Sequence, residues 1–166
     1  MRRIVVTLMV CALMLVGYTA TASAHSKARC FKGCVRGDVR FVPDTPSPTG
    51  LWTDSFAVGR ASCLGRIVMT SRHPTPAADQ IAGGKMTLVT AHGDRIWIEY
   101  TGSAPYPVVG VPSTIVVDLD FTIVGGTGCF THASGGGDMT AHVAFPGELN
   151  PGPWCADWTW HGSISY

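Results

Sequence analysis

The residues whose types could perform chemistry are few and scattered along the chain. His92 stands directly before Gly93-Asp94, and a histidine at such a turn could act as a general base if it faced a cavity. Asp118 and Asp120 lie two residues apart, which places both carboxylates on one face of a strand. That face is opposite an apolar one, so solvation is the expected state of both groups. These residues define no catalytic site.

Glycine, cysteine and histidine spacing excludes several kinds of cofactor site. The stretch "FTIVGGTGCFTHASGGGD" (121–138) is rich in glycine, but a strand-like run follows it and it carries no lysine. A phosphate-binding loop needs a helix after the glycines, so nucleotide binding is not expected. The cysteines lack the paired spacing of a zinc ribbon. We therefore expect neither a metal nor a cofactor.

The first 24 residues have the pattern of a signal peptide for export. Arg2 and Arg3 precede an apolar run (4–18), and the segment ends in Ala22-Ser23-Ala24, a small-x-small cleavage site. The apolar run is shorter than the roughly 20 residues that cross a bilayer. The sequence predicts a signal peptide over 1–24, one domain over 25–166, and a secreted protein whose final place, outside the cell, in the wall or in the periplasm, stays open.

Charge argues against several partners. The whole chain has a formal net charge of +1, and this falls to near zero once Arg2 and Arg3 are removed. No basic stripe is present to bind phosphates, so nucleic acid is not an expected partner. No second apolar segment is long enough to span a membrane after the signal.

The rest of the chain has the pattern of an all-β protein. Val, Ile, Thr and aromatic residues alternate with polar ones, and Gly or Pro interrupts them at short intervals. Gly93-Asp94 between two alternating runs indicates a hairpin. About eight antiparallel strands follow, best closed into a barrel, with a two-sheet sandwich as the alternative. The expected strands are 34–41, 53–62, 64–72, 84–92, 95–102, 113–124, 138–145 and 157–166, and the expected loops include 43–50, 73–80, 104–112 and 146–153.

Within such a barrel the glycine-rich segment is expected to form a sharp corner. Glycines in an all-β chain mark corners, bulges and close backbone contacts. The residues assigned to this structural corner are Gly125, Gly126, Gly128 and Phe130.

The inward faces of the expected strands are almost wholly apolar, with Phe56 and Val58 among them. His92, Tyr100, Thr90 and Arg60 are the few polar residues assigned to the same faces. Such a set predicts either a filled interior or a cavity for an apolar ligand, which a volume of about 300 Å³ or more would favour. The residues that we assign to weak ligand binding are Tyr100, His92, Phe121, Trp158 and Trp160.

Several segments resemble one known family. "GGTGCFTHASGGG" (125–137), "VGRASCLGRIVMT" (58–70), the hairpin 84–102 and the ending "GSISY" (162–166) resemble the allene oxide cyclase and dirigent superfamily. They are most similar to its small secreted bacterial members. The resemblance covers roughly residues 51–166 and implies an eight-stranded antiparallel barrel.

What the resemblance implies for function is a small apolar molecule held in or at the mouth of the barrel. Plant relatives include a cyclase and proteins that steer radical coupling, so a cyclase or isomerase activity is a further expectation. No catalytic motif maps onto this chain, and whether it is an enzyme stays open. Plant relatives form trimers or dimers, so the resemblance implies a homo-oligomer as one alternative, and the oligomeric state stays open. The alternative is a non-catalytic barrel with a filled core that acts through its surface, by oligomerisation, protection or partner binding.

The resemblance also implies a disulfide framework. Cys63 stands where the family has a histidine, and Cys129 stands where it has a basic residue after GGTG. If those positions are neighbours, Cys63–Cys129 is the expected disulfide. Because the first and last strands of a barrel pair, Cys155 is expected to bond Cys30 or Cys34. Five cysteines follow the signal, so one thiol would stay free.

Overall fold

The computed structural model of the protein describes residues 27–43, 49–75 and 79–166. The predicted signal peptide over 1–24 lies outside the described residues. In the described part, eight strands and one short 3-10 turn follow one another along the chain. They are β1 (Arg29–Pro43), β2 (Leu51–Ala61), β3 (Gly65–Pro74), β4 (Gln80–Thr90), β5 (Arg95–Ser103), β6 (Ser113–Gly126), η1 (Gly128–Phe130), β7 (Ser134–Phe145) and β8 (Trp154–Ser165).

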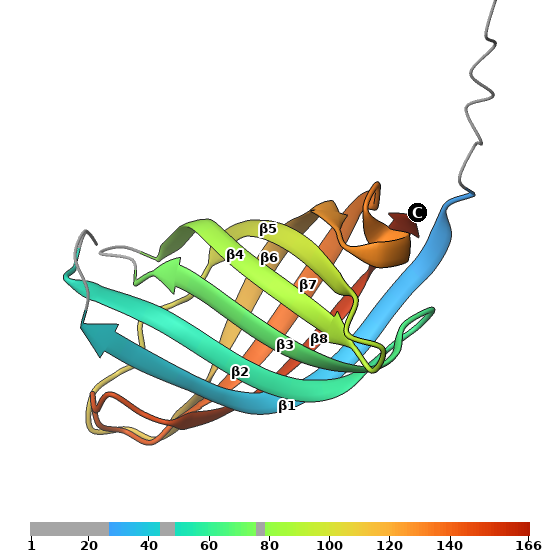
Figure 1. Cartoon of the computed structure of the whole chain (residues 1–166). Helices are drawn as coiled ribbons and strands as arrows, with labels where there is room; N and C mark the ends of the chain where they lie inside the picture. The colour runs from blue at the N-terminus through green and yellow to red at the C-terminus, as the bar shows by residue number, and fades with distance from the viewer. Residues whose placement is uncertain (1–26, 44–48, 76–78) are drawn as a thin grey trace, which may run out of the picture.

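The strands form one closed antiparallel barrel. Each strand pairs with the next in sequence, and β8 pairs back with β1, from Arg29 opposite Ile164 to Val39 opposite Trp154 (Figure 1). The sequence prediction of an all-β, eight-stranded antiparallel barrel is therefore confirmed, and the sandwich alternative is wrong. No helix in the described part of the chain is long and apolar enough to cross a membrane.

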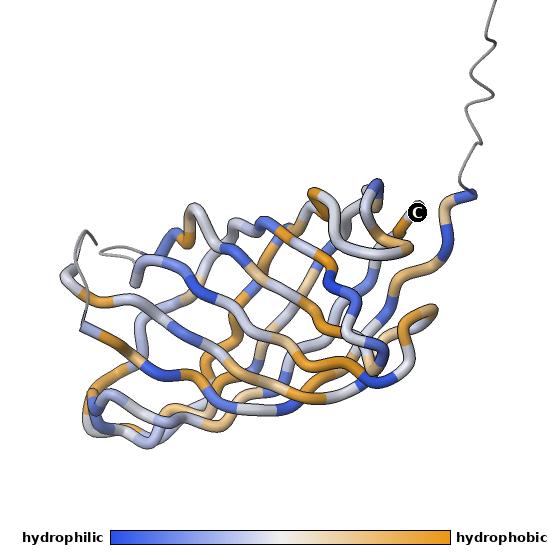
Figure 2. The backbone as a smooth tube through the Cα atoms, viewed as in Figure 1, coloured by the Kyte–Doolittle hydropathy of each residue, from blue (hydrophilic) through white to orange (hydrophobic). Residues whose placement is uncertain are grey.

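The two ends of the barrel differ in their connections. Short turns join β2 to β3 and β4 to β5 at one end, where η1 links β6 to β7 and both chain ends of the barrel also lie (Figure 1). We call this the turn end. β1, β3, β5 and β7 end at the opposite end of the barrel, where β2, β4, β6 and β8 begin, and we call this the loop end. Hydrophobic and hydrophilic residues are interspersed along the strands (Figure 2), as expected where one face is buried and the other solvated.

The turn-end half of the barrel is packed solid. Phe31, from the start of β1, is fully buried and lies between Trp160 and Phe121, with ring centroids 5.8 and 6.1 Å away. Gly33 makes room for this cluster, because a Cβ atom there would overlap the Trp160 ring. Trp160 and Phe121 are thus part of a filled core at this end.

The glycine-rich segment forms the connection from β6 to β7 at the turn end. β6 ends at Gly126, and Gly128, with a φ of +58°, starts the η1 turn. Phe130 is buried there and packs edge-on against Tyr166, with centroids 4.7 Å apart. A left-handed residue without a side chain fits this turn, because a Cβ at Gly128 would collide with the Asp94 carboxylate.

The expected inward face of β2 is wrong. Phe56 and Val58 point outward and are 54% and 52% exposed, and Arg60 is exposed as well. The inward face carries Thr53, Ser55, Ala57 and Ala61 instead. In the middle of β2 the outer Phe56 and Val58 are more apolar than the inner Ser55 and Ala57, so the sequence pattern indicated the opposite face. The consequence is that the middle of β2 contributes only small side chains to the interior.

The expected disulfides are not formed, since all five described cysteines are free and exposed. Cys34 lies opposite Thr159, whereas Cys155 lies opposite Asp38. Cys155 is therefore displaced from Cys34 by four strand positions, which correspond to about 13 Å. This exceeds the roughly 7 Å that a disulfide spans between Cα atoms. Cys30 lies opposite Ser163 and is farther still from Cys155. The outer-face ion pair of Arg36 and Asp157 (2.6 Å) lies between Cys34 and Cys155.

The expected Cys63–Cys129 pair is also not formed. The Cys63 thiol contacts the carbonyl oxygen of Cys30 at 3.5 Å, and the Cys129 thiol faces the Asp94 carboxylate at 3.8 Å. Cys63 occupies the β2–β3 turn and Cys129 the η1 turn, with the β4–β5 turn between them. The two positions that the family resemblance suggested as neighbours are therefore at separate turns.

The contact of the Cys63 thiol with the Cys30 backbone gives a first prediction. Exchange with glutathione disulfide, which takes up the two hydrogens as two glutathione thiols, should link Cys30 to Cys63. Ser62 supports this contact, since its hydroxyl donates to the Cys30 carbonyl oxygen at 2.8 Å. Peptide mapping without reduction checks the result, with Cys30→Ser as the variant that should abolish the link. A Cys63–Cys129 peptide as the main product would contradict the observed arrangement.

Candidate functional site: a cavity at the loop end of the barrel

The loop-end half of the barrel is hollow. A cavity of about 550 Å³ opens between the strands and the loop-end connections. Its wall is largely apolar, with Val39 and Phe41 from β1, and Trp154 and Trp158 from β8. The further apolar side chains of the wall include Leu51, Ile81, Met86, Ile115, Val117, Leu119, Met139, Ala141 and Val143.

The cavity exists because β2 and β3 put small or polar side chains inward at this end. Thr53 and Ser55 from β2 face Ser71 and His73 from β3 across the strand pair. At the turn end the same face of β3 carries Ile67 and Met69, which fill the interior. The change from Ile and Met to Ser and His along one face is therefore the point where the filled core gives way to the cavity.

Tyr100 reaches across the barrel wall from β5 to β3. It is buried, and the cross-strand position on β4 between them is Gly84, next to an irregularity in the β4–β5 pairing. A Cβ atom at Gly84 would overlap the Tyr100 ring, so glycine is needed for the ring to lie over β4. The Tyr100 hydroxyl thereby meets Nδ1 of His73 at 2.8 Å.

Burial holds both members of this pair in their neutral forms. Desolvation lowers the pKa of His73 from 6.5 to about 4. Desolvation also raises the pKa of Tyr100 to about 12, opposed by a hydrogen bond from the Ser71 side chain and aided by the charge of Asp54. At neutral pH the site is therefore polar but carries no charge.

Several other polar groups of the wall have partners inside the protein. The hydroxyls of Thr53 and Thr75 are 2.9 Å apart. At the mouth, the Asn150 side-chain oxygen accepts hydrogen bonds from the Gly152 amide (2.9 Å) and from the Trp154 indole (2.8 Å). Trp154 is buried between Phe41 and Phe145, with ring centroids 4.7 and 5.2 Å away. These contacts fix the β7–β8 connection that forms one side of the mouth.

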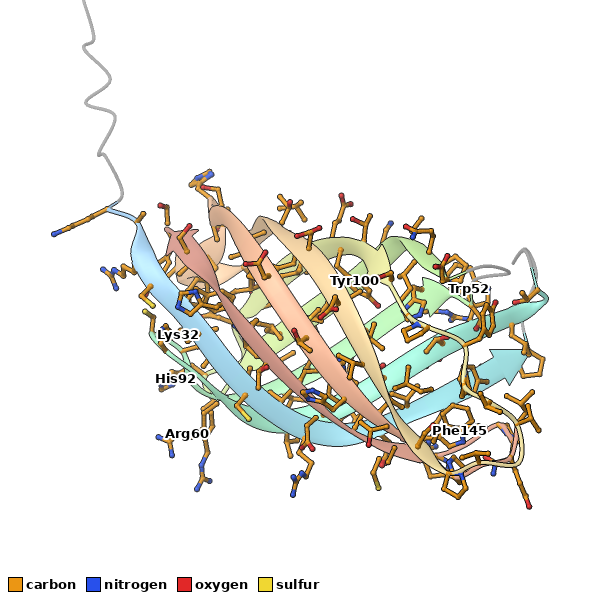
Figure 3. The ribbon with its side chains drawn as sticks, turned by 180° about the vertical axis from the view of Figure 1, so that it is seen from behind. Lys32, Trp52, Arg60, His92, Tyr100 and Phe145 are labelled. Carbon is orange, nitrogen blue, oxygen red and sulfur yellow. The ribbon has the colours of Figure 1, made fainter. Side chains whose placement is uncertain are left out.

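The residues assigned to ligand binding from sequence fall into two groups. Tyr100 and Trp158 line the cavity. Phe121 and Trp160 belong to the filled turn-end core, and His92 is exposed on the β4–β5 turn. Figure 3 shows His92 and Arg60 at the turn end, while Tyr100, Trp52 and Phe145 lie toward the loop end. The structure therefore does not bring the five assigned residues together.

The most informative site residue, His73, was missed because it was assigned to a loop. Pro74 directly follows it, and proline usually marks the end of a strand. β3 nevertheless continues to Pro74, so His73 stays on the face of Ile67, Met69 and Ser71. The two-residue alternation along that face was the signal that could have identified it.

The site offers no metal centre. Among the residues that the structure describes, no group of three or more His, Cys, Asp or Glu side chains is arranged to bind a metal ion. Among the described residues that line the cavity, the side chains that could donate or accept a proton are His73, Tyr100, Tyr106 and the serine and threonine hydroxyls.

Comparison with known proteins places no relative beside this chain. No protein-family model, curated protein or solved structure matches it.

Proposed function

We propose that the protein binds an uncharged, largely apolar small molecule in the loop-end cavity. The observation that carries the proposal is the cavity of about 550 Å³, which lies within the range of about 300–1,000 Å³ typical of small-molecule sites. Its apolar wall would gain the usual hydrophobic stabilisation when a ligand displaces water. The resemblance to the allene-oxide-cyclase-like barrels, proposed as the family, supports the same function.

Binding is favoured over turnover by the chemistry of the wall. General acid–base catalysis works best with a group whose pKa is near the operating pH. The pKa of His73 is about 4 and that of Tyr100 about 12, so neither group meets this condition.

Export by a signal peptide over residues 1–24 completes the proposal and would make the protein an extracytoplasmic carrier or receptor of its ligand.

Action through the outer surface is a second candidate, favoured by one observation. Phe56 and Val58 on β2 and Trp97 on β5 expose apolar surface on the outside of the barrel, and such surface can serve association. The filled core that this alternative assumed is not what the loop-end half of the barrel contains.

Filling the cavity tests the proposal. Ala141 is buried on β7, lines the cavity and lies opposite Val117 and Trp158. Ala141→Trp should weaken binding of 2-ethylnaphthalene by roughly tenfold to a hundredfold, because overpacking costs about 1–3 kcal/mol. Quenching of tryptophan fluorescence in the wild type and equilibrium dialysis in the variants give the affinities.

The matched control is Ala144→Trp, on the exposed outer face of the same strand. It should bind like the wild type, and unfolding curves verify that both variants fold. Absence of binding to the wild type, or equal loss in the two variants, would refute the cavity as the binding site.

A further inference from the structure

One hydrogen-bonded pair on the cavity wall leaves a donor unused. His73 lies on the inward face of β3, and Tyr100 reaches it from β5, with its hydroxyl 2.8 Å from Nδ1 of His73. The direction of this bond decides which nitrogen of His73 carries the proton.

Both groups are neutral, and of the two a phenol hydroxyl is the stronger donor and an imidazole nitrogen the stronger acceptor. The Tyr100 hydroxyl therefore donates its proton to Nδ1 of His73. A neutral imidazole that accepts at Nδ1 carries its own proton on Nε2. In the described part of the chain, no hydrogen-bond partner is found for His73 Nε2.

The surroundings restrict what could accept from that donor. Of the described residues that line the cavity, none is Asp, Glu, Lys or Arg. A charged ligand would leave water without an opposite charge to compensate it. Ser55 on β2, which lies opposite Ser71 on β3, adds a second donor: a hydroxyl without a partner among the described residues. The polar part of the wall is thus a small patch of neutral donors in an apolar cavity.

We propose that the ligand carries one neutral hydrogen-bond acceptor oxygen, such as that of a ketone or an ether, and that His73 Nε2 donates to it. This inference rests on the proposed function and specifies the class of its ligand. The apolar body of the molecule then lies against Met86, Met139 and Trp158, which line the same cavity. Tyr100 is a positioning residue, since it acts by fixing the proton on Nε2.

Three naphthalene probes separate the requirements. 2-Acetylnaphthalene has the carbonyl oxygen, 2-ethylnaphthalene lacks it, and 2-naphthoate replaces it with a charge. His73→Phe should weaken binding of 2-acetylnaphthalene about threefold to tenfold, the range for loss of one hydrogen bond. It should leave the affinity for 2-ethylnaphthalene unchanged or raised. His73→Gln, whose amide can donate, should restore part of the ketone affinity.

The carbonyl stretching band gives a readout that a structural role would not move. In the wild type, the band of bound 2-acetylnaphthalene should lie at lower frequency than in a non-hydrogen-bonding solvent, and this lowering should disappear in His73→Phe. Tyr100→Phe should reduce it without abolishing binding. The probe 2-naphthoate should bind most weakly of the three.

The outcomes distinguish the two proposals. If all three probes fail to bind the wild type, the proposed function falls together with this inference. If 2-ethylnaphthalene binds but His73→Phe affects both neutral probes equally, or if 2-naphthoate binds best, the ligand class proposed here is overturned while the cavity remains a binding site.

Discussion

Replacing Trp160 with alanine should lower the free energy of unfolding by about 3–5 kcal/mol, the usual cost of removing a large aromatic side chain from a core. Trp160 is 6% exposed and lies at the centre of the turn-end cluster, against Phe31. Gly33, directly across the β1–β8 pair, leaves no side chain that could move into the vacated space. Denaturant unfolding measured by circular dichroism gives the value.

Trp97→Ala is the matched control, because Trp97 is 43% exposed on the outside of β5. It should change the free energy of unfolding by less than about 1 kcal/mol. If Trp160→Ala cost no more than this control, the turn-end half of the barrel would not be the packed core that supports the cavity.

The pH dependence of stability should show the buried His73. Its pKa is lowered by burial from 6.5 to about 4, so between these values the unfolded chain binds a proton that the folded protein does not. Stability should therefore fall as the pH is lowered from about 6.5 to about 4 and stop falling for this reason below 4. The total contribution is about 3 kcal/mol, since one pKa unit corresponds to about 1.4 kcal/mol.

His73→Gln should remove this slope, and His92→Gln, on the exposed β4–β5 turn, should keep it. Tyr100, the titratable group that contacts His73, stays protonated throughout because its pKa is about 12. The Arg36–Asp157 ion pair affects stability in a lower pH range, because Arg36 lowers the pKa of Asp157 from 3.8. Unfolding free energies at pH 7, 5.5 and 4.5 check the prediction, and a wild type with no slope between pH 7 and 4.5 would contradict it.

The architecture was predictable from sequence for a physical reason. Strands such as β6 alternate strictly, with Val117, Leu119 and Phe121 on the buried face and Asp118 and Asp120 outside. The Gly93-Asp94 turn follows its sequence signal, and Gly93 adopts a φ of +88° there. Local patterns of this kind determine strand pairing between neighbours in sequence, which is all that an up-and-down barrel requires.

The site was less predictable because it depends on side-chain size and on contacts between distant strands. On β2 the outer Phe56 and Val58 are larger than the inner Ser55 and Ala57, so hydrophobicity alone indicated the wrong face. The contact of Tyr100 with His73 requires Gly84 on an intervening strand. No pattern within one strand reports such a three-strand arrangement.

The cysteines show the same limit. The pairing of the first and last strands, expected from barrel closure, is confirmed, but the bond of Cys155 to Cys30 or Cys34 was wrong because the register places Asp38 opposite Cys155. A difference of a few positions along a strand decides whether a disulfide can form, and the sequence does not fix the register to that precision.

The measurement that tests the central claim most directly is methyl NMR of the protein with 2-ethylnaphthalene. After residue 24 the chain has three methionines, Met69, Met86 and Met139. Met86 and Met139 line the cavity, whereas Met69 is fully buried in the core outside it. We expect nuclear Overhauser effects from the naphthyl protons to the methyl groups of Met86 and Met139 and none to that of Met69. Contacts to none of the three methyl groups, with the probe bound, would place the ligand outside the barrel and contradict the proposed function.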